Sequence, residues 1–329
     1  MKIAIITDGG GKHGLGHFYQ SVTLAKAMVH HGVSKKNIFF ITKSDAKVAS
    51  IVKDAGFKIL RRSTDQGIFS ILQAESPDHI VFDKLNVAPS LARRIKTKLS
   101  AKLTIMTNLT QANLYADVVV LAHDMNDFSN IVTRNKKNGK VEFFGPKYWM
   151  LRSDFYDFAE RKRKKSTMIE KIILMFGGTD PTNFSSIVLD QLLRMNQKLQ
   201  ITLVLGAGFT HQKKLKEVLN KHSNNKSKIC IVQKINNVAE RMFRSDLALV
   251  SPGLTFFESL MVGTPVLVFH HNEFQRKSYE GVFATLGKKD VEKLPLLIKN
   301  KKFTYPSSSK VVSLKIGKGR DTIVKEILG

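Results

Sequence analysis

The sequence predicts an α/β protein with two Rossmann-like, doubly wound parallel-sheet domains that face a cleft. Three observations support this fold class. The 329 residues suffice for two domains of roughly 100–200 residues each. Short apolar runs alternate with segments of helical periodicity, as expected for buried parallel strands covered by helices. This alternation starts a second time near residue 171, and 43% apolar residues exclude a mainly disordered chain.

The first series begins with an apolar strand at 2–7 and a helix at 18–31, whose apolar residues recur at helical spacing. A helix at 46–55 is expected to end at Gly56, since glycine commonly follows the last turn. Further strands are expected at 37–42, 58–60, 79–83, 102–106 and 117–122.

The second series begins with a strand at 171–176. We place the first domain at residues 1–152, a charged linker at 153–167 and the second domain at 168–329. Further strands are expected at 200–205, 229–232, 247–251 and 265–269, and helices at 185–195, 212–221, 238–243, 255–262, 290–298 and 321–328.

The composition limits the class of protein. The net charge of +26 favours anionic partners, which include phosphates and an anionic membrane surface, or else a solvated basic surface. Nucleic acid is a distant alternative, because no basic module with interleaved aromatics is present.

The single cysteine, Cys230, lies in an apolar run and is expected to be buried and inert in a reducing compartment. No apolar run reaches the about 18–20 residues of a membrane span, and no signal peptide is expected, so we expect a cytoplasmic protein, with peripheral contact to a membrane as an option.

The turn after the first strand is the leading candidate for chemistry. Gly14 and Gly16 allow the backbone to approach a ligand closely. His17 follows at the expected amino terminus of a helix, where the positive end of the helix dipole favours a neutral imidazole. A neutral imidazole can act as a general base. A structural histidine at a helix cap is the alternative.

Two other functions of this turn are less well supported. Its glycines match the dinucleotide-binding pattern G-x-G-x-x-G. In that pattern an acidic residue at the end of the second strand binds the ribose, but here the strand ends at Thr42-Lys43 and the first acid is Asp45. A dehydrogenase is therefore a minor alternative. His13 and His17 have a zinc-like spacing of four, but Gly16 argues against a helix there and no third ligand is evident. We expect no metal and no cofactor.

Asp83 ends the strand at 79–83, where parallel strands present side chains to a ligand. Its carboxylate could orient His17 or hold a sugar hydroxyl. The alternative is a helix cap for the segment after Pro89.

A second glycine turn opens the second series. Gly177 and Gly178 form it, Thr179 or Asp180 can cap the next helix, and Pro181 suits the first helical position. The functional interpretation is a diphosphate held by backbone N–H groups and a hydroxyl. The alternative is a helix cap alone.

A third turn contains Gly253 and Leu254. Glu258 beyond it could accept hydrogen bonds from both ribose hydroxyls of a nucleotide. Thr255-x-x-Glu258 also matches a capping box, and the residues alone do not decide between the two.

Polar residues also crowd the end of the strand at 265–269. His271, Asn272 and Gln275, with His270 beside them, are expected to contact substrate rather than a metal, because amide side chains are poor transition-metal ligands.

Taken in order, these segments resemble the UDP-sugar hydrolase of the pseudaminic acid pathway and the related spore coat polysaccharide biosynthesis proteins. That family is similar to glycosyltransferases of the GT-B architecture, which have two facing α/β domains. The resemblance covers roughly residues 1–285 and leaves the segment after about Gly287 as an extension. The segments that carry it are 14–17, 145–155, 176–180 and 251–258, with Gln275 beyond.

The resemblance implies a hydrolase that cleaves the C1–O bond of a UDP-sugar without a metal, in nonulosonic acid or surface-glycan biosynthesis. It implies that His17 activates water and that Asp83 supports it. The diphosphate would meet Gly177, Gly178 and Thr179, the ribose would meet Glu258, and Tyr148 and Arg152 would shape the cleft.

Three departures from the family motivate alternatives. Gln20 stands in place of an arginine, Phe257 in place of an asparagine, and Thr107-Asn108 in place of paired acids. One alternative is a glycosyltransferase with a sugar or lipid acceptor. The other is a non-catalytic protein that binds sugar nucleotides.

Overall fold

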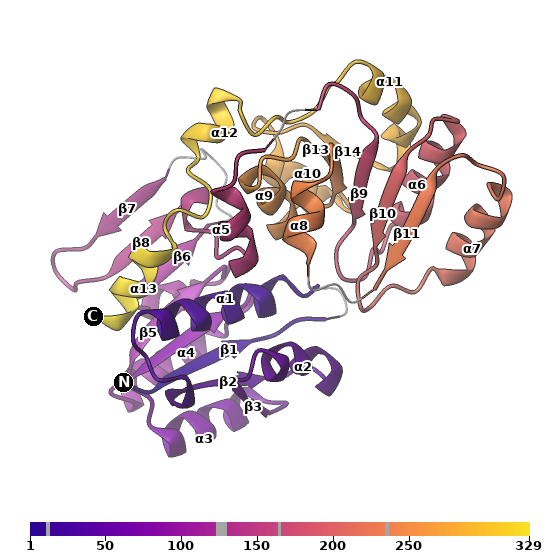
Figure 1. Cartoon of the computed structure of the whole chain (residues 1–329). Helices are drawn as coiled ribbons and strands as arrows, with labels where there is room; N and C mark the ends of the chain where they lie inside the picture. Colours follow the sequence, from indigo (N-terminus) through magenta and orange to yellow (C-terminus); the bar gives the residue numbers. More distant parts are fainter. Residues whose placement is uncertain (11–13, 123–129, 164–165, 234–236) are drawn as a thin grey trace. The chain divides into compact units, whose positions relative to one another are not determined.

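The computed structural model describes residues 1–10, 14–122, 130–163, 166–233 and 237–329. The chain divides into two compact units (Figure 1). Unit 1 comprises Met1–Leu151 and Leu314–Gly329, and unit 2 comprises Arg152–Ser313. Each unit contains one doubly wound, mainly parallel sheet, so the predicted fold class is confirmed.

The sheet of unit 1 has the strand order β3-β2-β1-β4-β5-β6-β8-β7. Neighbouring strands are parallel except for the antiparallel pair β7 and β8. Its strands are β1 (Ile3–Thr7), β2 (Ile38–Thr42), β3 (Lys58–Arg61), β4 (His79–Asp83), β5 (Lys102–Met106), β6 (Val118–Leu121), β7 (Ile131–Arg134) and β8 (Val141–Phe144).

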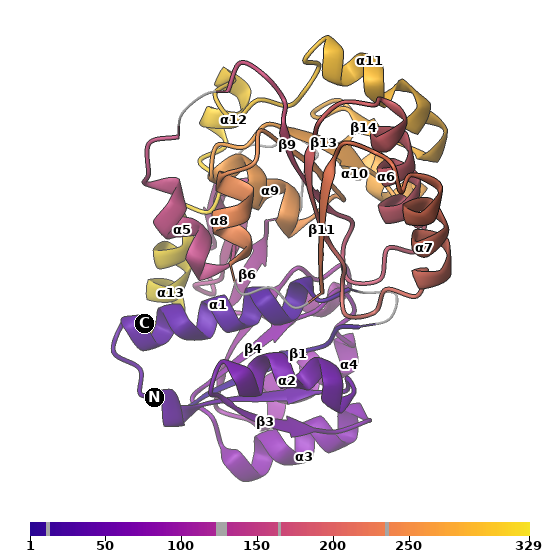
Figure 2. The ribbon, with the colours of Figure 1, turned by 45° about the vertical axis from the view of Figure 1, so that its right-hand side comes forward.

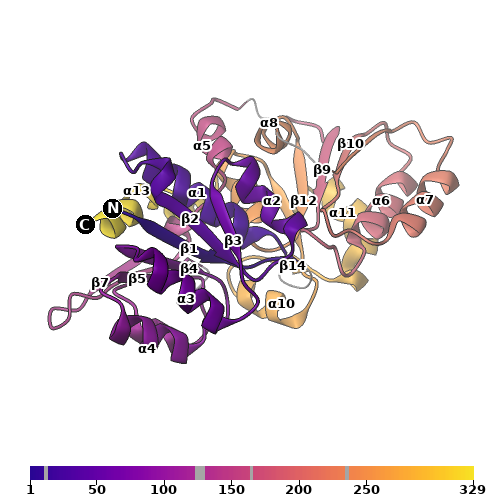
Figure 3. The same cartoon turned by 90° about the horizontal axis from the view of Figure 1, so that it is seen from below.

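Helices cover both faces of this sheet (Figure 3). Helices α3 (Asp65–Glu75) and α4 (Pro89–Lys98) bury their apolar stripes on one face. The other face carries α1 (Gly16–His30), α2 (Ala46–Asp54) and α13 (Arg320–Leu328). Short 3-10 helices lie at η2 (Lys35–Asn37), η3 (Gln111–Tyr115) and η4 (Pro146–Tyr148).

The carboxyl-terminal segment corrects the predicted domain assignment of 168–329. Leu314–Gly329 belongs to unit 1, because α13 packs against α1 and buries Ile323, Val324 and Ile327 there. This apolar stripe is better buried on the sheet of unit 1 than left in water.

The sheet of unit 2 has the order β11-β10-β9-β12-β13-β14 and is parallel throughout its described strands. Its strands are β9 (Lys171–Met175), β10 (Gln200–Val204), β11 (Lys228–Val232), β12 (Leu247–Val250), β13 (Val266–Phe269) and β14 (Thr285–Leu286).

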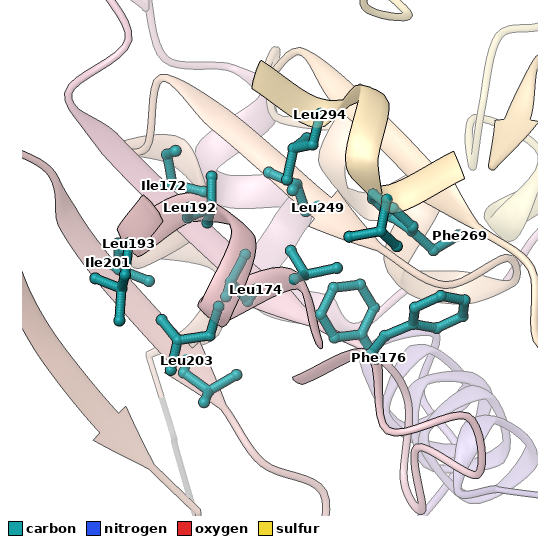
Figure 4. Close-up of a cluster of buried hydrophobic side chains, with 14 of the residues drawn as sticks. Ile172, Leu174, Phe176, Leu192, Leu193, Ile201, Leu203, Leu249, Phe269 and Leu294 are labelled. Carbon is teal, nitrogen blue, oxygen red and sulfur yellow. The ribbon is translucent and has the colours of Figure 1, made fainter. Parts of the chain in front are cut away.

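The helices of unit 2 also lie on both faces of the sheet. Figure 2 shows α6 (Phe184–Arg194) and α7 (Gln212–Lys221) on one side, and α8 (Val238–Phe243) and α9 (Leu254–Met261) on the other. Side chains of α6, of β9, β10, β12 and β13, and of α11 (Leu294–Lys299) interlock in one buried cluster (Figure 4). The remaining helices are α5 (Ser153–Ala159), α10 (Glu273–Tyr279), η5 (Lys288–Lys293) and α12 (Ser309–Ser313).

The predicted linker at 153–167 is wrong for the residues that the structure describes. Phe155 of α5 is buried, and the ring of Phe158 lies 5.4 Å from that of Phe243. The guanidinium of Arg163 donates hydrogen bonds to the backbone carbonyls of Phe243, Ser245 and Gly263. These contacts make the segment part of unit 2, since the burial of Phe155, the contact between the Phe158 and Phe243 rings and the hydrogen bonds of Arg163 would be lost if it were free.

Cys230 is exposed rather than buried, which corrects the prediction. It lies on β11, the edge strand of its sheet, and an apolar sequence run does not distinguish an edge strand from a central one. No helix within the described ranges is long and apolar enough to cross a membrane.

Candidate active site

Three neighbouring strands of unit 1 bring polar side chains to one edge of the sheet. The register pairs Thr7 with Asp83 and Asp83 with Met106, so β1, β4 and β5 end side by side. The residues that follow these strands must therefore lie close together. This edge is the place where parallel sheets bind ligands.

His17 and Asp83 form a hydrogen-bonded pair at this edge. The Nδ1 atom of His17 lies 2.8 Å from Oδ1 of Asp83. The Asp83 side chain is fully buried, whereas that of His17 is 11% exposed. A carboxylate only accepts hydrogen bonds, so the ring proton belongs on Nδ1 and Nε2 is left as the basic nitrogen.

Three further side chains donate to Asp83. Gln20 Nε2 lies 2.9 Å from Oδ1, Thr107 Oγ1 lies 3.2 Å from the same oxygen, and Ser21 Oγ lies 2.9 Å from Oδ2. The alternative role of Asp83 as a helix cap is wrong, because α4 begins after Ala88 and has no side-chain cap.

Two described glycines of the turn before His17 are hydrogen-bonded to each other. Gly10 N donates to Gly14 O at 2.6 Å, and Gly14 has a φ of 67°, which glycine adopts without strain. A Cβ on Gly9 would lie 2.8 Å from that carbonyl oxygen. Gly16 is the first residue of α1, so this turn delivers His17 directly to the first turn of the helix.

Asp8 precedes this turn and is held by a cation. Burial alone would raise the pKa of Asp8, but the ammonium of Lys84 at 2.6 Å, with the N–H of Lys43, outweighs burial and lowers it. Lys84 follows Asp83 directly in the sequence, but its ammonium forms its ion pair with Asp8.

The metal hypothesis partly falls outside the described residues, because His13 lies there. Among the residues that are described, no group of three or more His, Cys, Asp or Glu side chains is arranged to hold a metal ion.

In unit 2, the Gly177–Thr179 turn follows β9 and packs on the loop after β10. Gly177 has a φ of 82°, and Gly178 O accepts from Gly208 N at 2.9 Å. A Cβ on Gly206 would overlap the backbone of Gly178 and lie 2.5 Å from Gly177 O. Two glycine loops therefore touch backbone to backbone, which fixes the conformation of the candidate diphosphate turn.

Asp180 caps α6, and it does so from outside the helix. Its two carboxylate oxygens accept from the N–H groups of Phe184 and Ser185, each at 2.8 Å. The helix begins at Phe184, so the prediction that Pro181 occupies its first position is wrong. Because Asp180 satisfies the first helical N–H groups, a diphosphate here would bind the turn itself, and that role stays a prediction.

The third turn precedes α9. Gly253 is the N-cap residue of α9, with a φ of 114° and no side-chain cap. Its N–H donates to the Tyr279 hydroxyl at 2.9 Å, and burial raises the pKa of that hydroxyl. Thr255 lies inside the helix, so the predicted capping box is wrong.

Glu258 is fully buried and bound by Arg152. The guanidinium forms two hydrogen bonds to the carboxylate, from Nε to Oε1 at 2.8 Å and from Nη2 to Oε2 at 2.6 Å. The Arg152 backbone N–H adds a third at 3.2 Å. The structure thus joins two residues that the resemblance gave separate roles.

His271 joins the ends of three strands of unit 2. Its Nε2 lies 2.7 Å from Ser251 Oγ and 3.1 Å from Phe176 O, and its Nδ1 lies 3.0 Å from Thr182 Oγ1. Burial lowers its pKa, which favours the neutral ring with its proton on Nε2 facing the carbonyl.

Asn272 and Gln275 serve α10 in this structure. Asn272 Oδ1 caps the helix by accepting from Gln275 N at 2.9 Å. Gln275 Oε1 accepts from His271 N at 2.7 Å. Their predicted contact with substrate stays a prediction, as does that of Leu254.

Tyr148 lies inside unit 1 and is 2% exposed. Its ring centroid is 5.0 Å from that of Phe143. A Cβ on Gly319 would overlap the ring and lie 2.7 Å from its Cε1 atom. Tyr148 therefore packs against the carboxyl-terminal segment, and its ring has no open face toward a ligand.

Gln20, Ser21 and Thr107 join the site although their sequence context did not predict them as site residues. A signal for two of them was present: Gln20 and Ser21 are polar residues three and four positions after His17 on a helix that is otherwise largely apolar there. Such residues lie on the same helix face as His17. For Thr107 the signal was the resemblance, in which Thr107-Asn108 stands in place of paired acids.

Comparison with known proteins gives two similar sequences, and no protein-family model matches the chain. An uncharacterized protein of Methanocaldococcus jannaschii is 34% identical over 330 residues, covering 99% of this chain and 66% of the relative. The chain thus spans just under two thirds of that relative. The spore coat polysaccharide biosynthesis protein SpsG of Bacillus subtilis is 26% identical over 282 residues, covering 84% of this chain and 79% of SpsG.

Solved structures support the fold. MurG of Acinetobacter baumannii matches with a TM-score of 0.64 and 14% identity, covering 100% of this chain and 99% of MurG. The UDP-GlcNAc 2-epimerase of Methanocaldococcus jannaschii matches with a TM-score of 0.57 and 12% identity, again over 100% and 99%. The UDP complex of Staphylococcus aureus MnaA matches with a TM-score of 0.61 and 11% identity, over 99% and 96%. At these identities the likeness concerns the fold, which is of the GT-B type.

Proposed function

We propose that this chain is a hydrolase of a nucleotide-activated sugar, of the UDP-sugar class, acting in nonulosonic acid or surface-glycan biosynthesis. One observation carries the proposal: a histidine with a basic Nε2 is held by a buried carboxylate at a ligand-binding edge of the sheet. The similarity to a spore coat polysaccharide biosynthesis protein supports the glycan pathway. Structures of the same fold with UDP bound support the nucleotide.

The proposed hydrolysis forms one bond to C1 of the sugar, breaks another and transfers one proton to His17. A water oxygen forms a bond to C1 of the sugar while Nε2 of His17 accepts one water proton. The C1–O bond to the diphosphate breaks and its electron pair leaves with UDP. Asp83 then stabilises the imidazolium through the Nδ1–H hydrogen bond.

Unit 2 would bind the nucleotide. The N–H groups of the Gly177–Thr179 turn are suited to a diphosphate, because glycine lets the backbone approach an anion closely. Leu254 opens α9 and would supply a further N–H group, whereas the Gly253 N–H is already donated to the Tyr279 hydroxyl. The ribose could reach Glu258 only if the Arg152 side chain moves, since Arg152 binds both carboxylate oxygens.

The test is a panel of UDP-sugars that carry N-acetylated deoxy sugars, assayed for UDP release in ¹⁸O-labelled water. We expect UDP and free sugar, with ¹⁸O in the C1 hydroxyl. His17→Ala should lower kcat by about 10²- to 10⁴-fold. His30→Ala, the same change at an exposed position on the same helix, is the matched control and should keep the wild-type rate.

Three outcomes contradict hydrolysis. Equal rates of UDP release for His17→Ala and wild type would show that His17 is not the general base. UDP release only in the presence of a sugar or lipid hydroxyl would identify a glycosyltransferase. Tight UDP binding without turnover of any donor would identify a non-catalytic binding protein.

A further inference from the structure

Thr107 has an unusual backbone conformation beside the candidate site. Its φ is 58°, in the left-handed region that β-branched residues rarely adopt. The chain holds it there through the hydrogen bond from Thr107 N to Val120 O at 2.9 Å. The next side chain, Asn108, fixes the loop by accepting from Val87 N at 2.9 Å. A conformation of this kind persists when surrounding contacts determine it, and it is often found at functional sites.

The Thr107 hydroxyl closes a buried hydrogen-bonded triangle. It lies 2.8 Å from Gln20 Nε2, which donates to it, and it donates to Asp83 Oδ1 at 3.2 Å. Gln20 Nε2 also donates to Asp83 Oδ1 at 2.9 Å. An amide nitrogen has two hydrogens, so Gln20 can make both bonds at once. Thr107 is 8% and Gln20 3% exposed, which shields the triangle from competing water.

The triangle fixes the oxygen that His17 contacts. Oδ1 of Asp83 accepts hydrogen bonds from the side chains of Gln20, Thr107 and His17, whereas Oδ2 accepts one from Ser21. Rotation of the carboxylate would break the bonds to Oδ1. With Oδ1 fixed, the proton of the His17 ring is held on Nδ1 and Nε2 stays a free acceptor.

We propose that Thr107 and Gln20 are positioning residues that fix the Asp83 carboxylate, and through it the Nδ1–H tautomer of His17. The left-handed backbone at Thr107 is the conformation that brings its hydroxyl to this carboxylate. The catalytic consequence rests on the proposed hydrolase function. The tautomer itself does not depend on it.

Thr107→Gly tests this directly, because glycine adopts a φ of 58° without strain and lacks the hydroxyl. We expect an unfolding midpoint close to that of wild type, because the strain that glycine relieves offsets the lost hydrogen bonds and the greater freedom of the unfolded chain. We expect kcat for UDP release to fall by about 10- to 100-fold, the usual range for losing a hydrogen bond to a charged group, with little change in KM. Thr107→Ser keeps the hydroxyl and should restore most of the lost rate.

The tautomer is measured by ¹⁵N NMR of the histidine side chains in the full chain, with His17 assigned from the spectrum of His17→Asn. We expect the Nδ1–H form in wild type and in Thr107→Ser, and a mixture of tautomers in Thr107→Gly. Gln20→Met, which keeps the length of the side chain without its donors, should also give a mixture and provides a second variant if Thr107→Gly folds poorly.

The outcomes separate the two proposals. A pure Nδ1–H tautomer in both Thr107→Gly and Gln20→Met overturns the positioning role. So does a lower unfolding midpoint in Thr107→Gly with wild-type kcat, which would show a structural role alone. If wild type releases no UDP but the tautomer shifts as expected, positioning stands and the hydrolase proposal falls.

Discussion

The buried ion pair between Arg152 and Glu258 gives a stability prediction that can be worked out from its geometry. Glu258→Gln removes the charge from a side chain that is fully buried, while Arg152 is only 18% exposed. Arg152 then keeps its charge with little access to water. Removal of one partner of a buried pair costs about 3–5 kcal/mol. Because the guanidinium retains some exposure, we expect the free energy of unfolding to fall by about 3 kcal/mol, at the low end of that range.

The assay is urea unfolding of the full chain in a double-mutant cycle with Arg152→Met, Glu258→Gln and the double variant. The double variant removes both charges, so it should be more stable than the sum of the single losses predicts. We expect a coupling free energy of about 1.5 kcal/mol or more, as for other close charge pairs. Glu217→Gln is the matched control, since Glu217 pairs with Lys214 on the exposed surface of α7, and it should leave the unfolding curve unchanged.

A coupling below about 0.5 kcal/mol, the value of an exposed pair, would show that burial does not strengthen this ion pair. UDP affinity measured on the same variants tests whether Glu258 also binds the ribose, in addition to its ion pair with Arg152. If Glu258 also accepts ribose hydroxyls, Glu258→Gln should weaken UDP binding more than Arg152→Met does. Equal effects on affinity would leave Glu258 with the ion pair alone.

Three other perturbations have clear expected outcomes. Gly206→Ala drives a methyl group into the backbone of Gly178, so UDP affinity measured by calorimetry should fall by about tenfold or more. Gly208→Ala meets mainly the Thr179 side chain and should cost less; equal losses would argue against the diphosphate turn. Burial lowers the pKa of His79 from 6.5 to about 4, so the unfolded chain binds a proton in this window that the folded chain does not. The free energy of unfolding should therefore fall by up to about 3 kcal/mol as the pH drops from 6.5 to 4, and His79→Gln should flatten this part of the profile; parallel profiles would contradict it. If the positive charge docks on an anionic membrane, the chain should bind phosphatidylserine vesicles at low salt and leave them at high salt; equal binding to neutral vesicles would oppose this.

Local pattern predicted most strands, because a buried parallel strand requires an apolar run and its following helix requires an apolar stripe. The hairpin of β7 and β8 was not predicted. All four residues of β7 (Ile131–Arg134) are exposed. A strand with no buried face does not require the apolar run by which the other strands were predicted. The same limit applies to Cys230, whose apolar run lies on an edge strand.

Predictions about caps failed where the chain used a partner outside the local motif. Thr255-x-x-Glu258 matches a capping box, but Glu258 is bound by Arg152, which is 106 positions away. Asp180 was one of two predicted caps for the next helix, and it acts from a turn that ends several residues before the helix begins. A motif of four residues does not specify a competing long-range ion pair, although the ion pair can be the stronger interaction.

Two series of alternating strands and helices could be predicted from the sequence alone, as could Asp83 at the end of a strand and His17 just after a glycine turn. Those features depend on neighbouring residues along the chain. The adjacency of β1, β4 and β5 could not be predicted in this way, because strand order depends on the crossovers between distant segments. That order brings Thr107 to Asp83 and makes a hydrogen-bonded site from residues that the sequence keeps far apart.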